Sequence, residues 1–422
     1  MNCVPQPIDP IPLKTPLYNH LSMHPSLEIS CTISRRLLGR KIVLGVTGSI
    51  AAVETVKLAR LLIRHGAQVI PVMTGAAAQI IRPDALEFAT GRAPIVKITG
   101  GVEHVALCGQ TAERADLLLI APATANTISK IACGIDDTPV TTMATTALGS
   151  GIPLLIVPAM HGSMYEHKIV LENIEKLKAI GVQFMDPRME EHIAKIPSVE
   201  DIVDRVLAML GPKDLDGKRV LVLAGPTMEP IDDMRIISNR SSGATALALA
   251  KEAYYRGAEV ILWHSAYIEP PRWVAKAQAF RTVADILNLA KKLRRVEVIM
   301  VPAAISDFRV KGGPSKGKVP SDGPLHLELE PTPKVILALK SKCRLLVGFK
   351  AESKVSREEL LLRARDRLKK YGAHIMVAND LSKVSHKETE VLIIDKDGGM
   401  VEAKGPKERV STVIVDQVVK WL

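Results

Sequence analysis

Along the first half of the chain, short runs of aliphatic and β-branched residues alternate with stretches in which apolar residues recur every three to four positions. The runs 41–46, 68–73, 117–120 and 154–157 predict buried strands, and the period from Ala51 to Leu62 predicts a helix. Strands that alternate with helices pair in parallel and carry helices on both faces of the sheet. The pattern therefore predicts a doubly wound α/β domain, in which ligands bind at the carboxyl ends of the strands.

The same pattern restarts after residue 217. The run KRVLVLAG at 218–225 resembles KIVLGVTG at 41–48, and VIMVPA at 298–303 resembles LLIAPA at 118–123. We therefore predict two doubly wound, mainly parallel-sheet units, each with its own nucleotide-type site. A shared fold pattern without common ancestry would produce the same likeness.

Composition marks the segments outside these two units. Residues 1–38 are predicted to be an N-terminal surface arm, because their first half is crowded with proline, which favours extended chain over a core element. Residues 211–217 are predicted to be a linker. The first domain then covers residues 39–210 and the second covers residues 218–422.

Length and charge narrow the class of protein. A chain of 422 residues with 47% hydrophobic residues is expected to form two cores, and it has no apolar run long enough to span a bilayer. Five scattered cysteines without a CxxC pair favour a reducing compartment, so we expect a soluble, cytoplasmic protein. The net charge of +11 with only 3% aromatic residues fits a solvated basic surface and pockets for phosphorylated substrates better than a nucleic-acid partner. Neither half carries the dinucleotide fingerprint with its downstream acidic residue, which argues against an NAD(P)-dependent oxidoreductase.

Small and polar residues follow three of the strands predicted in the first half, at 45–51, 121–126 and 158–165. Backbone amides at the start of a helix after such a turn can bind phosphate, although a tight turn that needs glycine produces the first pattern equally well. The segment 101–105 contains His104, whose ordinary pKa suits proton transfer near neutral pH. Taken alone, such a histidine is more commonly a satisfied surface or core group.

As a set, these segments resemble the flavin-binding cysteine decarboxylase family over roughly residues 40–210. The resemblance implies a flavodoxin-like or Rossmann-like domain that binds FMN and decarboxylates phosphopantothenoylcysteine. It implies His104 as the catalytic acid–base group, on the family's Gly-x-x-His segment, with Met160 and His161 at the substrate and His161 also counted as catalytic. The residues implied for FMN are Gly48, Ser49, Ile50, Thr74, Ala121, Thr124 and Asn126.

Two positions depart from the family pattern. His161 stands where the family has asparagine, and an imidazole that is protonated can still bind the substrate carboxylate. Many members carry a cysteine in a Gly-rich flap, which donates a proton to the reduced intermediate, whereas residues 181–199 contain none here. The chain resembles an archaeal-type form without this flap, and its proton donor stays unassigned. The alternative is a ligase joined to a non-catalytic flavoprotein scaffold.

The second half opens with AGPTMEPID at 224–232 and RIISNRSSG at 235–243. Amides, hydroxyls and a guanidinium group that follow a strand suit a phosphorylated acid, although Ser241 or Ser242 would serve equally well as a helix cap. These segments closely resemble the signature of phosphopantothenate–cysteine ligases, and the resemblance continues to the C-terminus. Further matching segments follow in the family's order, at 303–308, 317–319, 331–334, 348–352 and 378–380.

This second resemblance implies a Rossmann-like domain that joins 4′-phosphopantothenate to cysteine through an acyl-cytidylate, with CTP as co-substrate and Mg²⁺ on the triphosphate. Asn239 and Lys318 are implied as catalytic, with Lys316 as a competing register for the lysine; no metal ligand is assigned. The residues implied for CTP are Ala303, Ala304, Asp307, Lys318, Phe349, Arg367 and Lys370, the last two being equally compatible with a solvated helix face. Those implied for the substrate are Arg235, Asn239, Ser241 and Ser242.

The ligase product is the decarboxylase substrate, so the two resemblances together imply one bifunctional enzyme of coenzyme A biosynthesis. They also imply trimeric flavin domains and dimeric ligase domains, which could combine in a dodecamer.

Overall fold

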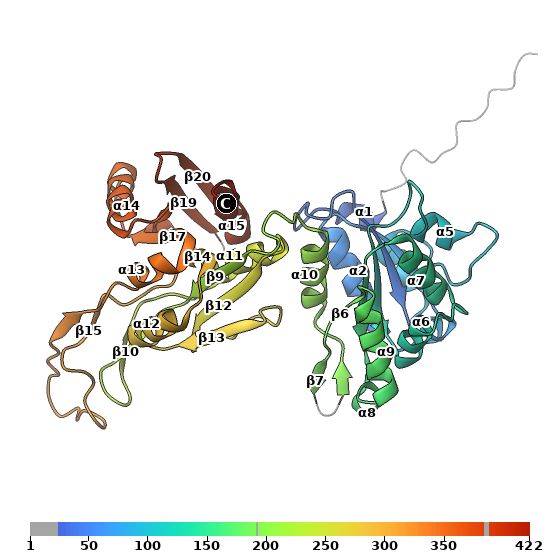
Figure 1. The fold of residues 1–422 in the computed structure, drawn as a ribbon, viewed down its shortest axis with the longest axis horizontal. Helices are drawn as coiled ribbons and strands as arrows, with labels where there is room; N and C mark the ends of the chain where they lie inside the picture. Colours follow the sequence, from blue (N-terminus) through green and yellow to red (C-terminus); the bar gives the residue numbers. More distant parts are fainter. Residues whose placement is uncertain (1–23, 191–192, 384–387) are drawn as a thin grey trace, which may run out of the picture. The chain divides into compact units, whose positions relative to one another are not determined.

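The computed structural model describes residues 24–190, 193–383 and 388–422 (Figure 1). By their contacts these residues form two compact units, Met1–Val199 and Glu200–Leu422. Each unit has its own sheet and its own core, which confirms the predicted fold class of two doubly wound, mainly parallel-sheet units.

The sheet of the first unit has five parallel strands in the order β2-β1-β3-β4-β6. Its strands are almost entirely buried because their sequences are continuous apolar runs, as expected for a sheet covered on both faces. The strands predicted at 41–46 and 68–73 are confirmed with identical bounds, and the other two extend slightly beyond the predicted ends. The five strands are β1 (Lys41–Val46), β2 (Gln68–Met73), β3 (Leu117–Ala123), β4 (Leu154–Pro158) and β6 (Gln183–Phe184).

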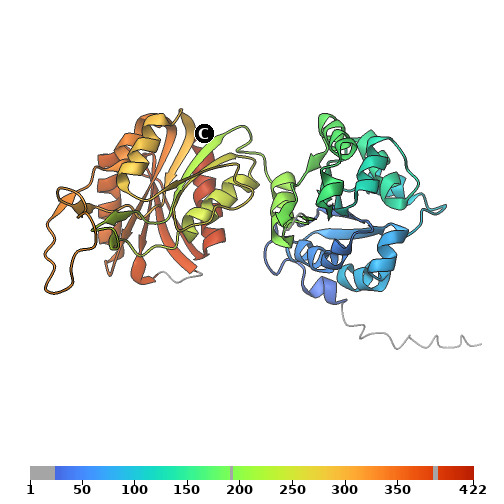
Figure 2. The same ribbon diagram turned by 90° about the horizontal axis from the view of Figure 1, so that it is seen from below.

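Helices cover both faces of this sheet (Figure 2). Alternate residues of one strand serve the two faces: Val43 belongs to the core beneath α6, α7 and α9, whereas Ile42 and Leu44 are buried on the opposite face. The helical elements of the unit are α1 (Pro25–Glu28), η1 (Ile50–Glu54), α2 (Thr55–Arg64), α3 (Gly75–Ile80), α4 (Pro83–Thr90), α5 (Glu103–Cys108), α6 (Ala125–Ala132), α7 (Pro139–Ser150), α8 (Gly162–Tyr165) and α9 (Lys168–Ala179).

A small antiparallel sheet that the sequence did not reveal lies beside the end of β4. It consists of β5 (Met160–His161), β8 (Ile193–Lys195) and β7 (Arg188–Glu190), in that order. The pairing joins Met160 to Ala194 and His161 to Ile193. The stretch 181–199, which contains no cysteine, therefore supplies two strands beside the segment that carries His161.

The second unit contains an eight-stranded sheet in the order β13-β12-β9-β14-β17-β18-β19-β20. The first six strands in this order are parallel and follow the Rossmann arrangement, with the first strand of the unit at the centre. The last two strands are antiparallel. The strands are β9 (Arg219–Ala224), β12 (Glu259–Ser265), β13 (Lys276–Phe280), β14 (Val296–Val301), β17 (Cys343–Glu352), β18 (Ile375–Asp380), β19 (Glu388–Asp395) and β20 (Met400–Pro406).

Two cores lie on the two faces of this sheet. Helices α11 (Ala244–Tyr255) and α15 (Lys407–Lys420) pack on one face, and α12 (Val283–Lys292), α13 (Val335–Leu339) and α14 (Arg357–Tyr371) pack on the other. Outside the main sheet, two short hairpins pair β10 (Met228–Pro230) with β11 (Ile236–Ser238), and β15 (Phe308–Val310) with β16 (Leu329–Pro331). The remaining helical elements are α10 (Val199–Leu210), η2 (Lys340–Lys342) and η3 (Leu381–Lys383).

The predicted arm and linker both differ from expectation where the structure describes them. Residues 1–23 of the arm lie outside the described residues, but the backbone N–H of Leu37 donates to His65 at 2.9 Å and its side chain is fully buried. In the predicted linker, the side chain of Leu215 belongs to the core of the second unit and its N–H donates to Arg256 at 3.1 Å. Residues near Leu37 therefore pack on the first unit, and residues near Leu215 pack on the second. Neither segment is free chain at these positions.

Candidate active sites

The first candidate site lies where β1 and β3 end. Strand order on the sheet reverses between these neighbours, which is the position at which doubly wound sheets bind ligands. The buried Thr47 hydroxyl joins the two strand ends, donating to the Pro122 carbonyl at 2.9 Å and accepting the Thr124 N–H at 3.0 Å. The loops that carry two of the predicted FMN segments are thus fixed to each other.

The predicted FMN residues gather at this edge of the sheet. Gly48 lies against the first turn of α3: a Cβ added to Gly48 would stand 2.6 Å from the Cβ of Ala76. Thr74 caps α3 by accepting the Ala77 N–H at 3.2 Å. Thr124 caps α6 in the same way, by accepting the Thr127 N–H at 3.3 Å. Ala121 is buried at the end of β3, whereas Ser49, Ile50 and Asn126 lie at the start of η1 or α6, with 77% of Ile50 exposed.

Met160 and His161 lie next to these loops. The N–H of Ala159 donates to the Ala123 carbonyl at 3.0 Å, which holds the segment after β4 beside the end of β3. Met160 is 9% exposed, and the exposed His161 ring contacts the Ser163 hydroxyl through Nδ1 at 3.1 Å. The structure therefore brings the predicted substrate residues to the same edge as the predicted FMN residues.

His104 lies on α5, which packs against α7. Its Nδ1 atom is buried and has no hydrogen-bond partner among the described residues, a costly arrangement that indicates a group kept for a ligand or a proton. The neighbouring Glu103 carboxylate accepts the Thr99 N–H at 2.9 Å, and hydrogen bonds from Thr99 lower its pKa.

Cys108, which follows His104 on α5, is a poor candidate for the unassigned proton donor. Its side chain is fully buried, its Sγ lies 3.6 Å from the Sδ of Met143, and burial raises its pKa to about 12. A thiol in this state gives up its proton only at strongly alkaline pH.

The second candidate site is a pocket of about 690 Å³ in the second unit, which is in the usual size range for small-molecule sites. It opens at the carboxyl ends of β14, β17 and β18 and at the start of α11. Seven of the residues predicted for ligation line it: Asn239, Ser241, Ser242, Ala303, Ala304, Asp307 and Phe349. The predicted Arg235, Lys318, Arg367 and Lys370 do not line it.

Hydrogen bonds between the loops after β9 and β14 shape this pocket. The fully buried Thr227 accepts the Ser306 N–H through its hydroxyl at 2.8 Å, and its own N–H donates to the Ala304 carbonyl at 3.2 Å. The same carbonyl accepts the Asn239 side-chain amide at 3.2 Å. The predicted catalytic Asn239 is thus attached directly to one of the residues predicted for the nucleotide.

The start of α11 offers an anion site on the wall of the pocket. Gly243 precedes the helix with φ +72°, a backbone conformation that favours glycine. The free N–H groups and the dipole of a helix N-terminus favour a phosphate. The Ser241 and Ser242 hydroxyls make long local contacts, to the Gly243 N–H at 3.3 Å and the Ala244 N–H at 3.4 Å, which leaves them only weakly engaged as caps.

Four cations line the pocket that the sequence analysis did not assign to it. They are Arg240, Lys334, Lys350 and Lys407. The Lys334 ammonium forms an ion pair with Asp307, and Lys350 pairs with Glu352 at 2.9 Å. Lys334 and Lys350 stand inside matching segments and could have been found by charge alone, whereas Lys407 begins α15 and had no motif around it. Tyr371 also lines the pocket, and the Arg367 guanidinium lies 5.8 Å from its ring centroid.

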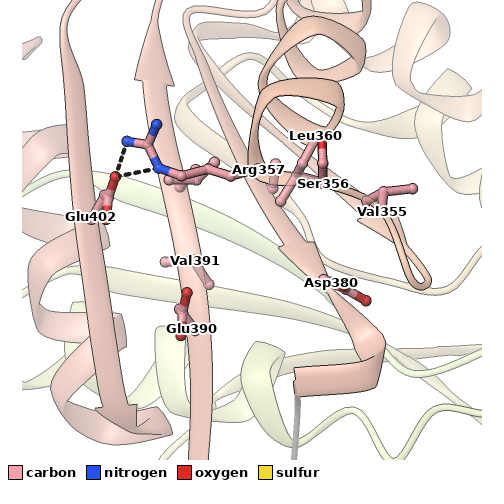
Figure 3. A pocket seen from close by; sticks show the side chains of 10 residues that line it. Val355, Ser356, Arg357, Leu360, Asp380, Glu390, Val391 and Glu402 are labelled. Atoms are coloured by element: carbon pink, nitrogen blue, oxygen red, sulfur yellow. Dashed lines mark hydrogen bonds and ion pairs between the residues drawn. The ribbon is translucent and has the colours of Figure 1, made fainter.

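A second pocket in this unit lies between the start of α14 and strands β18 to β20 (Figure 3). Its volume of about 50 Å³ suits a few water molecules and no nucleotide. Arg357 and Glu402 form an ion pair at its rim, and the Asp380 carboxylate accepts the N–H of Lys354 at 3.0 Å. These contacts indicate a structural role for this region.

None of the described helices has the length and apolar character that crossing a membrane requires. The described residues also contain no cluster of three or more histidine, cysteine, aspartate or glutamate side chains that could hold a metal ion.

Fold and sites together define a flavoprotein-type α/β domain followed by a Rossmann-type domain with a nucleotide-sized pocket. Residues 31–211 match the family model described as Flavoprotein, and residues 215–422 match the one described as DNA/pantothenate metabolism flavoprotein C-terminal domain. The first of these matches supports a flavin cofactor.

Relatives with both segments are similar along nearly the whole chain. The coenzyme A biosynthesis bifunctional protein CoaBC of Thermococcus kodakarensis is 49% identical over 405 residues, which cover 95% of this chain and 100% of the relative. The protein of the same name from Methanocaldococcus jannaschii is 40% identical, with coverage of 94% and 98%. A solved C-terminal domain of a CoaBC protein covers 49% of this chain and 97% of that domain, at 30% identity and a TM-score of 0.41.

The chain therefore belongs to the family of bifunctional coenzyme A biosynthesis proteins. It is an enzyme with a decarboxylase-type flavoprotein segment followed by a ligase-type segment.

Proposed function

We propose that the second unit joins 4′-phosphopantothenate to cysteine with CTP, and that the first unit decarboxylates the product to 4′-phosphopantetheine with FMN. The observation that carries the first half of this proposal is the 690 Å³ pocket, because residues from five matching segments line it together. The observation that carries the second half is the shared edge formed by the loops after β1, β2, β3 and β4, with the buried, unpartnered Nδ1 of His104 on the same unit.

In the proposed ligation, the substrate carboxylate attacks the α-phosphate of CTP and displaces pyrophosphate, and the amine of cysteine then displaces CMP from the acyl-cytidylate. The start of α11 would hold phosphate through its free N–H groups. Asn239 would hold the acyl-cytidylate, with its side chain already fixed by the Ala304 carbonyl. Asp307 and Phe349 would flank the nucleotide, and Lys318 would reach the phosphates, with Arg235, Ser241 and Ser242 at the substrate.

Mg²⁺ would bind chiefly through the triphosphate, as it usually does where the protein supplies one or two ligands. The cations on the pocket wall suit the same triphosphate. Lys334 precedes α13 and Lys407 begins α15, so basic residues from two separate elements are placed where a polyanion would bind.

FMN, when bound, supplies the oxidation of the thiol-bearing carbon that makes the carboxylate easy to lose, and it returns the hydride afterwards. The residues fit such a group: Gly48 leaves the turn after β1 open, the caps at Thr74 and Thr124 direct helix N-termini to the edge, and exposed Ile50 offers apolar surface for a ring. His104 would move protons, because its Nδ1 is without a partner. Met160 and His161 would contact the substrate, and His161 when protonated would bind its carboxylate.

The oligomer and the location are further parts of the proposal. We propose trimeric flavin domains and dimeric ligase domains, possible together in a dodecamer, in which His104 serves FMN held by a neighbouring subunit. A cytoplasmic location is supported by the scattered cysteines.

A ligase with a non-catalytic flavoprotein scaffold is the second candidate. His161 in place of the family's asparagine favours it, as does the absence of cysteine from residues 181–199. The buried, unpartnered Nδ1 of His104 favours the catalytic alternative, because a scaffold gains nothing from that cost.

One experiment tests both activities. The purified protein is incubated with 4′-phosphopantothenate, cysteine, CTP and Mg²⁺, and the amide product and carbon dioxide are measured. We expect 4′-phosphopantetheine together with carbon dioxide, and we expect His104→Gln to release phosphopantothenoylcysteine alone. Accumulation of that intermediate by the unmodified protein would favour the scaffold, and absence of product with either CTP or ATP would refute the ligase assignment.

A further inference from the structure

The loop between β15 and β16, residues 312–327, carries both candidate lysines, Lys316 and Lys318. We call it the lysine loop. Both lysine side chains are exposed, and neither lines the pocket. Whatever holds this loop therefore decides where a lysine ammonium can reach.

The lysine loop is attached to the turn between β10 and β11, residues 231–235. The N–H of Ser315 donates to the Ile231 carbonyl at 2.9 Å. The N–H of Gly317 donates to the Asp233 carboxylate at 3.1 Å. Two residues further on, the N–H of Val319 donates to the Asp232 carboxylate at 3.0 Å. The residues directly before and directly after Lys318 are therefore both tied to acidic side chains.

Asp232 is the centre of this attachment. Its carboxylate is 3% exposed and also accepts the N–H groups of Met234 at 2.8 Å and Arg235 at 2.7 Å. The Arg235 guanidinium donates to the same carboxylate at 2.6 Å and to the Val319 carbonyl at 3.0 Å. Both backbone groups of Val319 are thus bound by the Asp232–Arg235 pair, which gives this part of the loop one defined position.

We propose that Asp232 and Asp233 are positioning residues for ligation, which fix the backbone on both sides of Lys318 so that its ammonium group meets the triphosphate. The inference rests on the proposed CTP-dependent function and adds the groups that hold the lysine. A long exposed loop loses much conformational freedom when it is ordered by a ligand, and prior attachment removes part of that cost. The Asp232–Arg235 pair also neutralises the carboxylate, so that it does not oppose the lysine for the phosphates.

A double-mutant cycle on the full chain tests this inference. Asp233 is exposed, so Asp233→Ala should leave the fold intact while it removes the side-chain hydrogen bond to the Gly317 N–H. We expect kcat/KM for CTP to fall between about tenfold and 100-fold, as for other small displacements of a reacting group. We expect Lys318→Met to cost more, and the double variant to cost no more than Lys318→Met alone, because Asp233 acts through that lysine.

Further variants and readouts keep the result specific. Asp322→Asn changes an exposed acid on the same loop and should leave the kinetics unchanged. Asp232→Asn should reproduce the effect of Asp233→Ala, and both should speed tryptic cleavage after Lys316 and Lys318. Flavin absorbance, which belongs to the other unit, should not move in any of these variants.

The outcomes separate this inference from the proposed function. If the unmodified chain does not turn over CTP, the proposed ligation fails. If it turns over CTP and Asp233→Ala matches it, or if the losses from Asp233→Ala and Lys318→Met multiply, the positioning role is refuted. Coupling of Asp233 to Lys316 instead of Lys318 would refute the assignment of Lys318.

Discussion

Gly48 illustrates how a single residue decides whether the first site can exist. The Gly48 backbone lies so close to Ala76 that an added Cβ would stand 2.6 Å from the Ala76 Cβ. Real side chains do not approach this closely, so the turn after β1 would move away from the segment at the start of α3, which follows β2. Because these two segments carry residues proposed for FMN, a methyl group at this position changes the site without touching the core of the sheet.

We predict that Gly48→Ala weakens flavin binding by about tenfold or more, as expected for a misplaced phosphate-binding turn. Flavin affinity is measured by titrating the stripped protein with FMN and following fluorescence. Gly75→Ala is the matched control, because a Cβ on Gly75 meets nothing within 4 Å, and it should bind flavin normally. Equal affinities for the two variants would contradict the assignment of Gly48 to the flavin site.

Lys334 is a residue of the second site whose charge suits ligand binding more than it stabilises the fold. It lines the pocket and forms an ion pair with Asp307, another lining residue. The Lys334 side chain is 41% exposed and that of Asp307 is 69% exposed, so their mutual attraction contributes little to stability. An ammonium group at this position is therefore more useful to a bound polyanion than to the fold.

Removing the Lys334 ammonium group should weaken binding of the nucleotide and leave the fold unchanged. We predict that Lys334→Met raises KM for CTP by about tenfold, the size expected when one charge-assisted hydrogen bond is lost. Lys311→Met is the control, since Lys311 pairs with Glu328 on the surface of a neighbouring hairpin. Steady-state kinetics at varied CTP check the result, and an unchanged KM would show that Lys334 does not meet the nucleotide.

At the scale of elements, sequence pattern predicted what is buried and missed what is held by pairing alone. Strands such as 41–46 were predictable because a continuous apolar run is the mark of a strand covered on both faces. The hairpin strands β10, β15 and β16 have three residues each. The residues of β15 and β16 are exposed or half-buried, whereas two of the three residues of β10 are buried. Nothing in such short, mixed sequences sets them apart from loop, so their position depends on tertiary contacts.

The candidate sites divide in the same way. Motif positions such as Asn239 and Asp307 were found because their neighbours in sequence form a recognisable set, and these residues do line one pocket. Lys407 was missed because it reaches the pocket from the start of α15, far away in sequence. Arg235 stood in a motif, yet its guanidinium group binds Asp232 and the lysine loop, a contact that only the folded hairpin creates.

The attachment of the lysine loop to the β10–β11 turn has a predictable pH dependence. Burial alone would raise the pKa of Asp232, but hydrogen bonds from Met234, Val319 and Arg235 outweigh it and lower the pKa to about 2. A carboxyl group whose pKa is lower in the folded state than in the unfolded chain stabilises the fold above the unfolded value of about 4. This stabilisation is lost as the pH falls from about 4 towards 2.

We predict that the lysine loop detaches over this pH range in the unmodified protein and that Asp232→Asn removes the dependence. Cleavage of the loop by pepsin, which works at low pH, should accelerate between about pH 4 and pH 2. In Asp232→Asn cleavage should already be fast at the upper end of the range. A variant that shows the same acceleration as the unmodified protein would assign the transition to another carboxyl group.

At the scale of the whole molecule, the chain forms two units, each with its own sheet and core. The boundary between them along the chain differs between the contacts and the family models. Contacts divide the chain after Val199, whereas the family models meet between residues 211 and 215. The predicted linker, residues 211–217, contributes Leu215 to the core of the second unit. Asp214 adds an ion pair with Arg256 at 3.0 Å. The second unit therefore needs residues that sequence pattern placed outside it.

A pair of fragments tests where the second unit begins. We predict that fragments 211–422 and 218–422 both catalyse CTP-dependent ligation, because both keep the whole pocket. The shorter fragment should be less stable by about 2 kcal/mol, the contribution of one fully buried leucine side chain. Urea unfolding measures the difference, and Leu215→Ala in the longer fragment should reproduce most of it, since that variant empties the same site and keeps the backbone. If both fragments unfold at the same urea concentration, Leu215 does not stabilise the unit. A longer fragment without ligase activity would mean that catalysis requires the first unit as well.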